Sequence, residues 1–230
     1  RVTHSPCASK SRTHPCLVGL HIGTSGWMYP GWRDVLYPGV PKAKWLGHAS
    51  RTFTGLEVNA TFYRQQSEET FRRWAAETPR DFRFAIKGHR FITHYKRLRE
   101  VAESVERLRR PARGLGDKLD AVVWQLPADF RCDLDRLGSF LAELKGWPEV
   151  RHALELRHRS WFTPAVAERL GEARVWAADI RRWRAEGRTV HCYFDNDAEG
   201  AAPRDALRLI ELVGREPAVT IESWRATARS

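Results

Sequence analysis

The sequence predicts an α/β protein whose parallel strands alternate with helices and form a (β/α) barrel. Segments of period-two alternation are separated by helical patterns of about ten or more residues, which is the arrangement of βα units. Several strands carry aliphatic side chains on one face and charged ones on the other, as barrel strands do between the helix ring and the lumen. No change in composition divides the chain, so we expect one domain over residues 19–215. We expect residues 1–18 to be a disordered tail or a gene-start artefact, and residues 216–230 to be a C-terminal extension.

The clearest strand signal lies at residues 55–62. Its apolar row is Leu56, Val58, Ala60 and Phe62, and its polar row is Glu57, Asn59 and Thr61. A carboxylate, an amide and a hydroxyl in line suit a binding cavity better than a solvated face. We therefore expect the polar row to face the barrel interior.

The remaining elements follow from the same periodicities and from their start and stop signals. Further strands are expected at residues 19–26, 82–87, 119–126, 150–158 and 189–194. Helices are expected at residues 41–51, 67–77, 100–110, 134–145, 164–172, 177–186 and 203–213. Pro41 suits the first position of its helix, Ser67 suits an N-cap, and Pro127 stops the strand before it.

The composition indicates a packed globular protein. The chain has 230 residues, of which 42% are hydrophobic and ten are Trp. No apolar run reaches the roughly 18 residues of a membrane span, so no membrane association is expected. The four cysteines show neither metal-site spacing nor a CxxC motif, which favours a reducing, cytoplasmic compartment.

The net charge of +11 leaves a nucleic-acid or other acidic partner open. The basic residues are 32 Arg and 7 Lys, however, and they are scattered along the chain. Such a skew is what GC-rich coding produces. Nucleic acid is therefore the alternative to the favoured partner, a small-molecule ligand, and the oligomeric state is open.

Polar residues near the C-terminal ends of four strands predict a site at the barrel mouth. They are Glu57, Asn59, Lys87, Gln125, Glu155 and Arg157. We expect Glu57 or Glu155 to act as general acid or base, with Lys87 as a further catalytic group. Asn59 and Gln125 would orient the ligand, while Arg157, with Lys87, would hold an anionic group. The alternative is a buried ion-pair network that closes a small lumen.

Other kinds of site have weaker support. The two carboxylates could ligate a metal together with His89 or His158, but Lys87 and Arg157 already neutralise them, so no metal is expected. The chain contains neither GxGxxG nor a P-loop motif, and no cofactor is expected. Aromatic residues just after strand ends, among them Trp27, Tyr63 and Trp161, either stack on a ligand or pack the barrel rim.

Six stretches of the chain resemble one family. They are Ile22–Trp27, Glu57–Tyr63, Phe91–His94, Gln125–Pro127, Glu155–Phe162 without its Arg159, and Tyr193–Asp197. In this order they are similar to the DUF72 proteins over about residues 19–213. The resemblance implies a TIM-barrel-like parallel (β/α) barrel in a mostly prokaryotic, cytoplasmic family, and it implies no particular reaction. Asn196, within the last stretch, is a ligand-binding candidate by this match.

The chain departs from the family pattern near residues 171–176. Two strands with their helices, roughly fifty residues, are missing there, which leaves about six of the eight strands of a closed barrel. Such a barrel either closes with fewer strands or stays incomplete with two exposed edges. We expect the strands at residues 150–158 and 189–194 not to pair well.

Together these observations predict an enzyme, or a degenerate enzyme, that acts on a small polar, anionic or sugar-like ligand by carboxylate acid–base chemistry. Any site residue that the missing strands supply is absent, so whether the chain is an enzyme stays open. The alternative is a non-catalytic basic protein that binds nucleic acid or another acidic partner.

Overall fold

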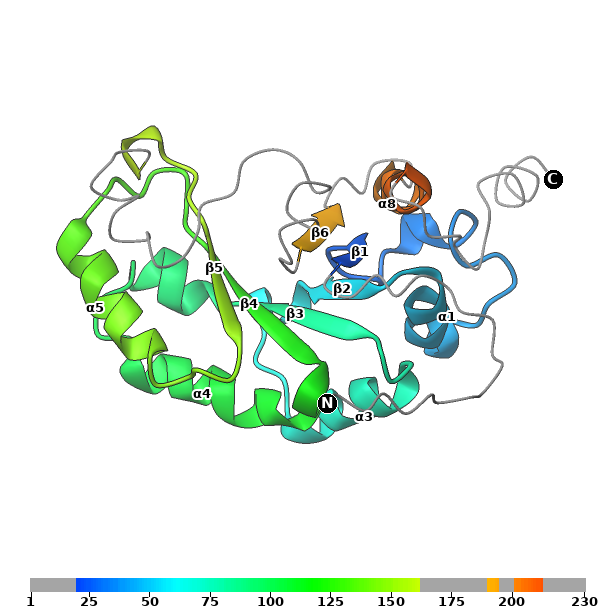
Figure 1. Cartoon of the computed structure of the whole chain (residues 1–230), viewed down its shortest axis with the longest axis horizontal. Coiled ribbons are helices and arrows are strands. Elements are labelled where there is room, and N and C mark those ends of the chain that lie inside the picture. The colour runs from blue at the N-terminus through cyan, green and yellow to red at the C-terminus, as the bar shows by residue number, and fades with distance from the viewer. Residues whose placement is uncertain (1–19, 162–189, 195–200, 213–230) are drawn as a thin grey trace, which may run out of the picture.

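The computed structural model describes residues 20–161, 190–194 and 201–212 (Figure 1). The strands are β1 Leu20–Thr24, β2 Gly55–Val58, β3 Arg83–Lys87, β4 Leu119–Gln125, β5 Arg151–Glu155 and β6 Val190–Phe194. The helices are α1 Trp45–Thr52, α2 Ala60–Tyr63, α3 Glu68–Glu77, α4 Ala102–Ala112, α5 Leu134–Leu144 and α8 Ala201–Leu212. The predicted N-terminal tail, the helices at 164–172 and 177–186, the deletion near 171–176, Asn196 and the C-terminal extension lie outside the described residues.

All described strands run parallel. β2, β3, β4 and β5 form one sheet in that order, and β1 pairs with β6. A parallel bridge between Ser25 and Glu57 joins the two groups, where the Gly26 N–H donates to the Glu57 carbonyl at 2.7 Å. The predicted α/β class with a parallel sheet is thus confirmed.

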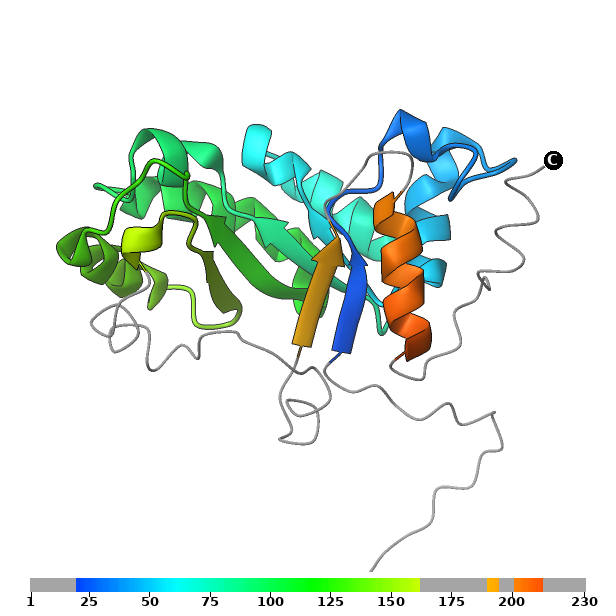
Figure 2. The same ribbon diagram turned by 90° about the horizontal axis from the view of Figure 1, so that it is seen from above.

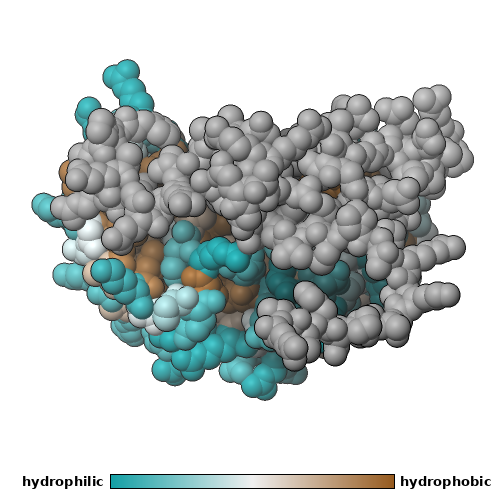
Figure 3. Space-filling view, viewed as in Figure 1, coloured by the Kyte–Doolittle hydropathy of each residue, from teal (hydrophilic) through white to brown (hydrophobic). Residues whose placement is uncertain are grey.

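The spatial order β6-β1-β2-β3-β4-β5 leaves β5 and β6 at its two ends. Within the described residues, no ladder joins these two strands, as the sequence predicted. The ends of β5 are exposed and its centre is half-buried, whereas β2 is buried throughout. Figure 3 shows apolar side chains gathered over the half of the molecule that holds β4, β5 and α5. The TIM-barrel form itself stays a prediction.

Helices cover one face of the β2–β5 sheet, where the main core lies. Figure 1 shows α3, α4 and α5 along this side. The indole of Trp124 meets the ring of Phe140 on α5 edge to face, with centroids 5.1 Å apart. On α3, Phe71 is fully buried in the same cluster. Figure 2 shows α8 beside β1 and β6, and its Ala206 and Leu207 are buried.

The predicted strand at residues 55–62 is wrong in its second half. β2 ends at Val58, Asn59 has helical backbone angles (φ −69°, ψ −25°), and α2 follows. The cause is Thr61, whose hydroxyl bonds to the carbonyl oxygens of Val58 and Lys87, each at 2.7 Å. A turn made by side-chain hydrogen bonds therefore replaces the strand that the alternation of residue types predicted.

Other boundaries differ from the predictions by a few residues. A 3₁₀ turn at Lys42–Lys44 precedes α1, which begins at Trp45 rather than at Pro41. The N-cap of α3 is confirmed, because the hydroxyl of Ser67 accepts a hydrogen bond from the Thr70 N–H at 3.1 Å. The sequence did not predict the π-helical turn Phe91–Tyr95 that follows β3.

Candidate functional site

The strand register places four of the predicted site residues on one face. Glu57 is aligned with Ala85, two positions before Lys87, and Lys87 is aligned with Val123, two positions before Gln125. Gln125 is aligned with Glu155. Because side chains alternate between the faces of a strand, all four point away from Trp124 and the helix-covered core. They lie at or near the carboxyl ends of their strands, where parallel α/β proteins place their sites.

The centre of this face is a buried charged cluster. The Ser25 hydroxyl donates to Oε1 of Glu57 at 2.5 Å, and Nζ of Lys87 lies 3.6 Å from the same oxygen. Glu57 is 7% exposed and Lys87 is 5% exposed. Burial of an unpaired charge is costly, and here the carboxylate and the ammonium group are each other's partner.

Thr61 fixes the strand ends that carry this pair. Its side chain is fully buried, and its hydroxyl lies between the carbonyls of Val58 on β2 and Lys87 on β3. These bonds tie the residue after Glu57 to Lys87 itself. Thr61 therefore positions the two charged groups relative to each other.

A second, more open polar pair lies on β4 and β5. Nε2 of Gln125 donates to both carboxylate oxygens of Glu155, at 2.9 and 2.8 Å. Nε of Arg157 lies 3.8 Å from Oε1 of Glu155, and these side chains are 49% and 44% exposed. Solvent screens this ion pair, so it orients the carboxylate more than it stabilises the fold.

Phe62 lies beside Lys87 of the buried cluster, and His94 packs against Phe62. The Phe62 ring centroid is 5.7 Å from Nζ of Lys87 and 5.0 Å from the ring centroid of His94. Burial, and then the positive charge of Arg157, lower the pKa of His94, so its imidazole is neutral at pH 7. The hydroxyl of Thr93 also bonds to Nδ1 of His94, at 2.9 Å. The mouth of the sheet thus holds a neutral imidazole that packs against Phe62 and senses the charge of Arg157.

Sequence reasoning did not single out Ser25 or His94, and it placed Thr61 in the interior-facing polar row without giving it a role of its own. All three lie within stretches that resemble the family: Ser25 directly follows β1, Thr61 lies in α2 after β2, and His94 lies in the π-helical turn after β3. Their positions beside charged residues depend on neighbouring strands. No local pattern in the sequence contains that information.

The other predicted ligand-binding residues are placed differently. Trp27 is 6% exposed and packs edge-on against Trp74 of α3, and Trp161 is 1% exposed with its Nε1 donating to the Phe130 carbonyl at 2.6 Å. Both therefore pack in the core. Tyr63 is 58% exposed and points outward, and Nδ2 of Asn59 donates to the Tyr29 hydroxyl at 3.3 Å.

Neither a metal site nor a membrane-spanning helix has geometric support within the described ranges. There, no group of three or more His, Cys, Asp and Glu side chains is arranged to hold a metal ion. Among the same residues, no helix has the length and the apolar character to cross a membrane.

Known proteins that are similar to this chain include two that share the description UPF0759. The chain is 30% identical over 158 residues to the UPF0759 protein YunF of Bacillus subtilis, covering 65% of this chain and 54% of that protein. It is 28% identical over 173 residues to the UPF0759 protein YecE of Escherichia coli K12, covering 75% of this chain and 61% of that protein. The chain therefore spans between about half and two thirds of these relatives.

Two solved structures share the fold. A DUF72 family protein of Thermotoga maritima superposes with a TM-score of 0.67 at 21% identity, covering 84% of this chain and 98% of that one. One from Enterococcus faecalis gives 0.67 at 16% identity, covering 86% and 96%. The family described as "Protein of unknown function DUF72" matches residues 21–175 and 169–228. This match extends over most of the chain, which therefore belongs to the DUF72 family.

Proposed function

We propose that the carboxyl-end face of the sheet binds a small polar, anionic or sugar-like ligand and acts on it by acid–base chemistry. The observation that carries this proposal is the buried cluster of Ser25, Glu57 and Lys87. A buried ion pair contributes little net stability compared with apolar packing. This ion pair lies at the carboxyl ends of parallel strands, which is where folds of this class place their functional sites.

The roles follow from charge and burial. Glu57, ionised beside Lys87, is the proton acceptor, and Ser25 holds its carboxylate in one orientation. Lys87 supplies a positive charge for an anionic group of the ligand or for a developing oxyanion. Both groups lie where little water competes, which strengthens their electrostatic interactions.

Glu155 is the second carboxylate of the proposed site. It is more accessible than Glu57, and Gln125 holds it through both oxygens. The two carboxylates have different surroundings, one buried beside Lys87 and one open to solvent, and two carboxylates in different surroundings can divide the acid and base roles. Arg157 adds a positive charge at the open side, suited to an anionic or polar ligand.

A thermal-shift screen of small phosphorylated compounds, carboxylic acids and sugars tests the proposal. A ligand at 100 times its Kd stabilises the folded state by about 2.7 kcal/mol, which raises the melting temperature measurably. The shift is expected to disappear in Glu57→Gln and Lys87→Met and to shrink in Glu155→Gln. Glu69→Gln, at an exposed position on α3, is the matched control and keeps the shift.

Hits from the screen are then tested for turnover. Loss of turnover with retained, weakened binding in Glu155→Gln supports the acid–base role. A ligand that stabilises the wild type and Glu57→Gln equally binds elsewhere and overturns the proposed site.

A further inference from the structure

A second surface combines exposed aromatic rings with basic side chains. Four large apolar side chains are exposed in the described part of the chain, and three of them lie at or next to the turn that follows β3. They are Tyr63 (58% exposed), Phe91 (45%) and Tyr95 (66%). We call these residues, together with Arg90 and Lys96, the aromatic surface. The ring centroids of Phe91 and Tyr95 lie 6.4 Å apart, so these rings are neighbours, and contiguous exposed apolar groups mark interaction sites.

Cations hold the rings of this surface in place. The guanidinium carbon of Arg90 lies 5.5 Å from the Tyr63 ring centroid and 5.7 Å from that of Tyr95. Nζ of Lys96 lies 5.9 Å from the Phe91 ring centroid. Each ring thus has a positive charge within the range of a cation–π contact. The same cations remain close enough to the surface to meet an anionic ligand.

The backbone beneath the surface has an unusual conformation. The π-helical turn Phe91–Tyr95 is followed by Arg97 and Leu98 in the left-handed region, with φ of 48° and 67°. Leu98 is 1% exposed, and its N–H donates to the Ile92 carbonyl at 3.0 Å. Left-handed backbone at residues other than glycine costs energy and concentrates at functional sites. This unusual backbone conformation marks the turn as a candidate functional feature.

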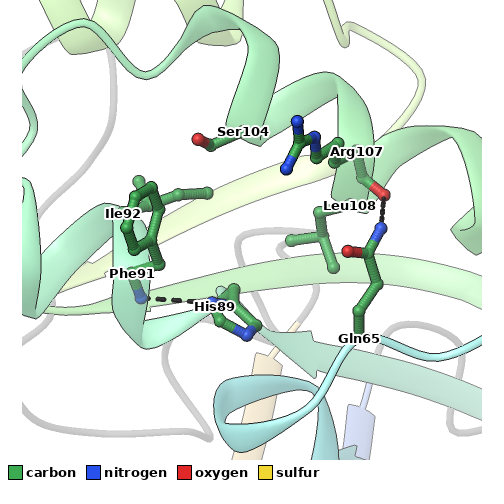
Figure 4. A pocket seen from close by; sticks show the side chains of 7 residues that line it. All are labelled: Gln65, His89, Phe91, Ile92, Ser104, Arg107 and Leu108. Atoms are coloured by element: carbon green, nitrogen blue, oxygen red, sulfur yellow. Dashed lines mark hydrogen bonds between the residues drawn. The ribbon is translucent and has the colours of Figure 1, made fainter.

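A small pocket adjoins Phe91 (Figure 4). It has a volume of about 170 Å³ and is lined by Gln65, His89, Phe91, Ile92, Ser104, Arg107 and Leu108. Pockets for drug-sized ligands measure about 300–1,000 Å³, so this one has room for a single ring system. Nδ1 of His89 accepts from the Phe91 N–H at 3.1 Å, which leaves the Nε2 of the neutral ring as a donor.

The chain segment that forms most of the aromatic surface carries only positive formal charges. Residues 89–99 contain Arg90, Lys96, Arg97 and Arg99 and neither Asp nor Glu. Some of these charges are shared, since Arg97 pairs with Asp129 at 2.5 Å. Interleaved rings and cations around one turn fit a ligand that presents flat unpaired rings and a polyanionic backbone.

We infer that the aromatic surface and its adjoining pocket bind single-stranded nucleic acid. Bases stack on Tyr63, Phe91 and Tyr95, and phosphates lie against the neighbouring basic groups. A duplex keeps its base faces covered and offers only its phosphates to this surface. This inference concerns the outer turn and does not rest on the proposed chemistry of the Glu57 site.

Fluorescence anisotropy with labelled oligo(dT) and oligo(U) of about 15 nucleotides tests the inference on the full chain. Binding is expected to weaken as salt is raised and to be stronger than binding to a duplex of the same length. Tyr63→Ala and Tyr95→Ala should each weaken binding about tenfold. Arg90→Gln should weaken it more than Arg80→Gln, an equal change of charge at an exposed residue just before β3.

The outcomes separate a built surface from general positive charge. Melting temperatures of the variants confirm that each is folded. Equal affinity for single strands and duplex, or equal effects of Arg80→Gln and Arg90→Gln, overturns the inference, as does absence of binding at low salt. Glu57→Gln is expected to bind the oligonucleotide as the wild type does, so failure of the proposed Glu57 site leaves this result unchanged.

Discussion

Nε2 of His21 lies 3.7 Å from Oδ2 of Asp120, although β2 and β3 lie between their strands. Adjacent strands are about 4.8 Å apart, so in a flat sheet the strands β1 and β4 would be about 14 Å apart. The contact therefore requires a strongly curved sheet whose inner face brings its ends together. An irregularity in the β3–β4 register, where Phe84 aligns with Leu119 and Ala85 with Ala121, places Asp120 outside the ladder.

The Glu57–Lys87 pair is expected to behave as one unit in stability measurements. Lys87→Met leaves a buried carboxylate without its cation and should lower the free energy of unfolding by about 3–5 kcal/mol. Adding Glu57→Gln to that variant should restore part of the loss. Urea unfolding of the two single variants and the double variant measures the coupling. Strictly additive effects would contradict a direct interaction.

Thr61 is expected to act through position and not through contact with the ligand. Thr61→Val removes the hydroxyl that bonds to the carbonyls of Val58 and Lys87, at a cost of about 1–3 kcal/mol. It should also weaken the binding of any ligand found in the thermal-shift screen. Thr61→Ser keeps the hydroxyl and should bind the ligand as the wild type does. Unchanged affinity in Thr61→Val would argue against the positioning role.

Gly23 is required by the close approach of β1 to β2. A Cβ at this position would lie 1.9 Å from the Gly55 carbonyl oxygen, and backbone cannot move aside as a side chain can. Gly23→Ala is expected to lower the free energy of unfolding by about 2–3 kcal/mol in a urea titration. Gly31→Ala is the control, because a Cβ there meets nothing within 4 Å. Equal effects of the two substitutions would refute this explanation.

His152 is expected to make the fold sensitive to acid. Burial lowers its pKa below 6.5, against a smaller opposite effect from its bond to the Trp147 carbonyl. Its Nδ1 accepts from Nε1 of Trp124 at 3.1 Å, so a proton on Nδ1 would break that bond. As the pH falls below about 6.5, the unfolded chain takes up a proton that the folded chain does not, and stability decreases.

The corresponding measurement is the free energy of unfolding between pH 8 and pH 5. His152→Gln removes one titrating group and should reduce the acid-side slope by up to about 1.4 kcal/mol per pH unit. Tyr95→Phe, at an exposed position without this titration, should keep the slope of the wild type. An unchanged slope in His152→Gln would show that other groups cause the acid sensitivity.

The sequence by itself determined the order of the elements. Local signals are strong there: Ser67 caps α3 through its own hydroxyl, and the alternation at residues 83–87 depends only on neighbours in the chain. The face that carries Glu57, Lys87, Gln125 and Glu155 also followed from period-two alternation. These properties are local, so one chain segment contains them.

Only the tertiary structure decided where β2 ends and which charges meet. Thr61 turns the chain after Val58 because the Lys87 carbonyl of another strand is within reach of its hydroxyl. Trp27 and Trp161 lie in the core because Trp74 and Phe130, distant in sequence, pack against them. Ser25 meets Glu57 because β1 lies beside β2. Each result depends on contacts between separate segments, and packing across the curved sheet selects those contacts.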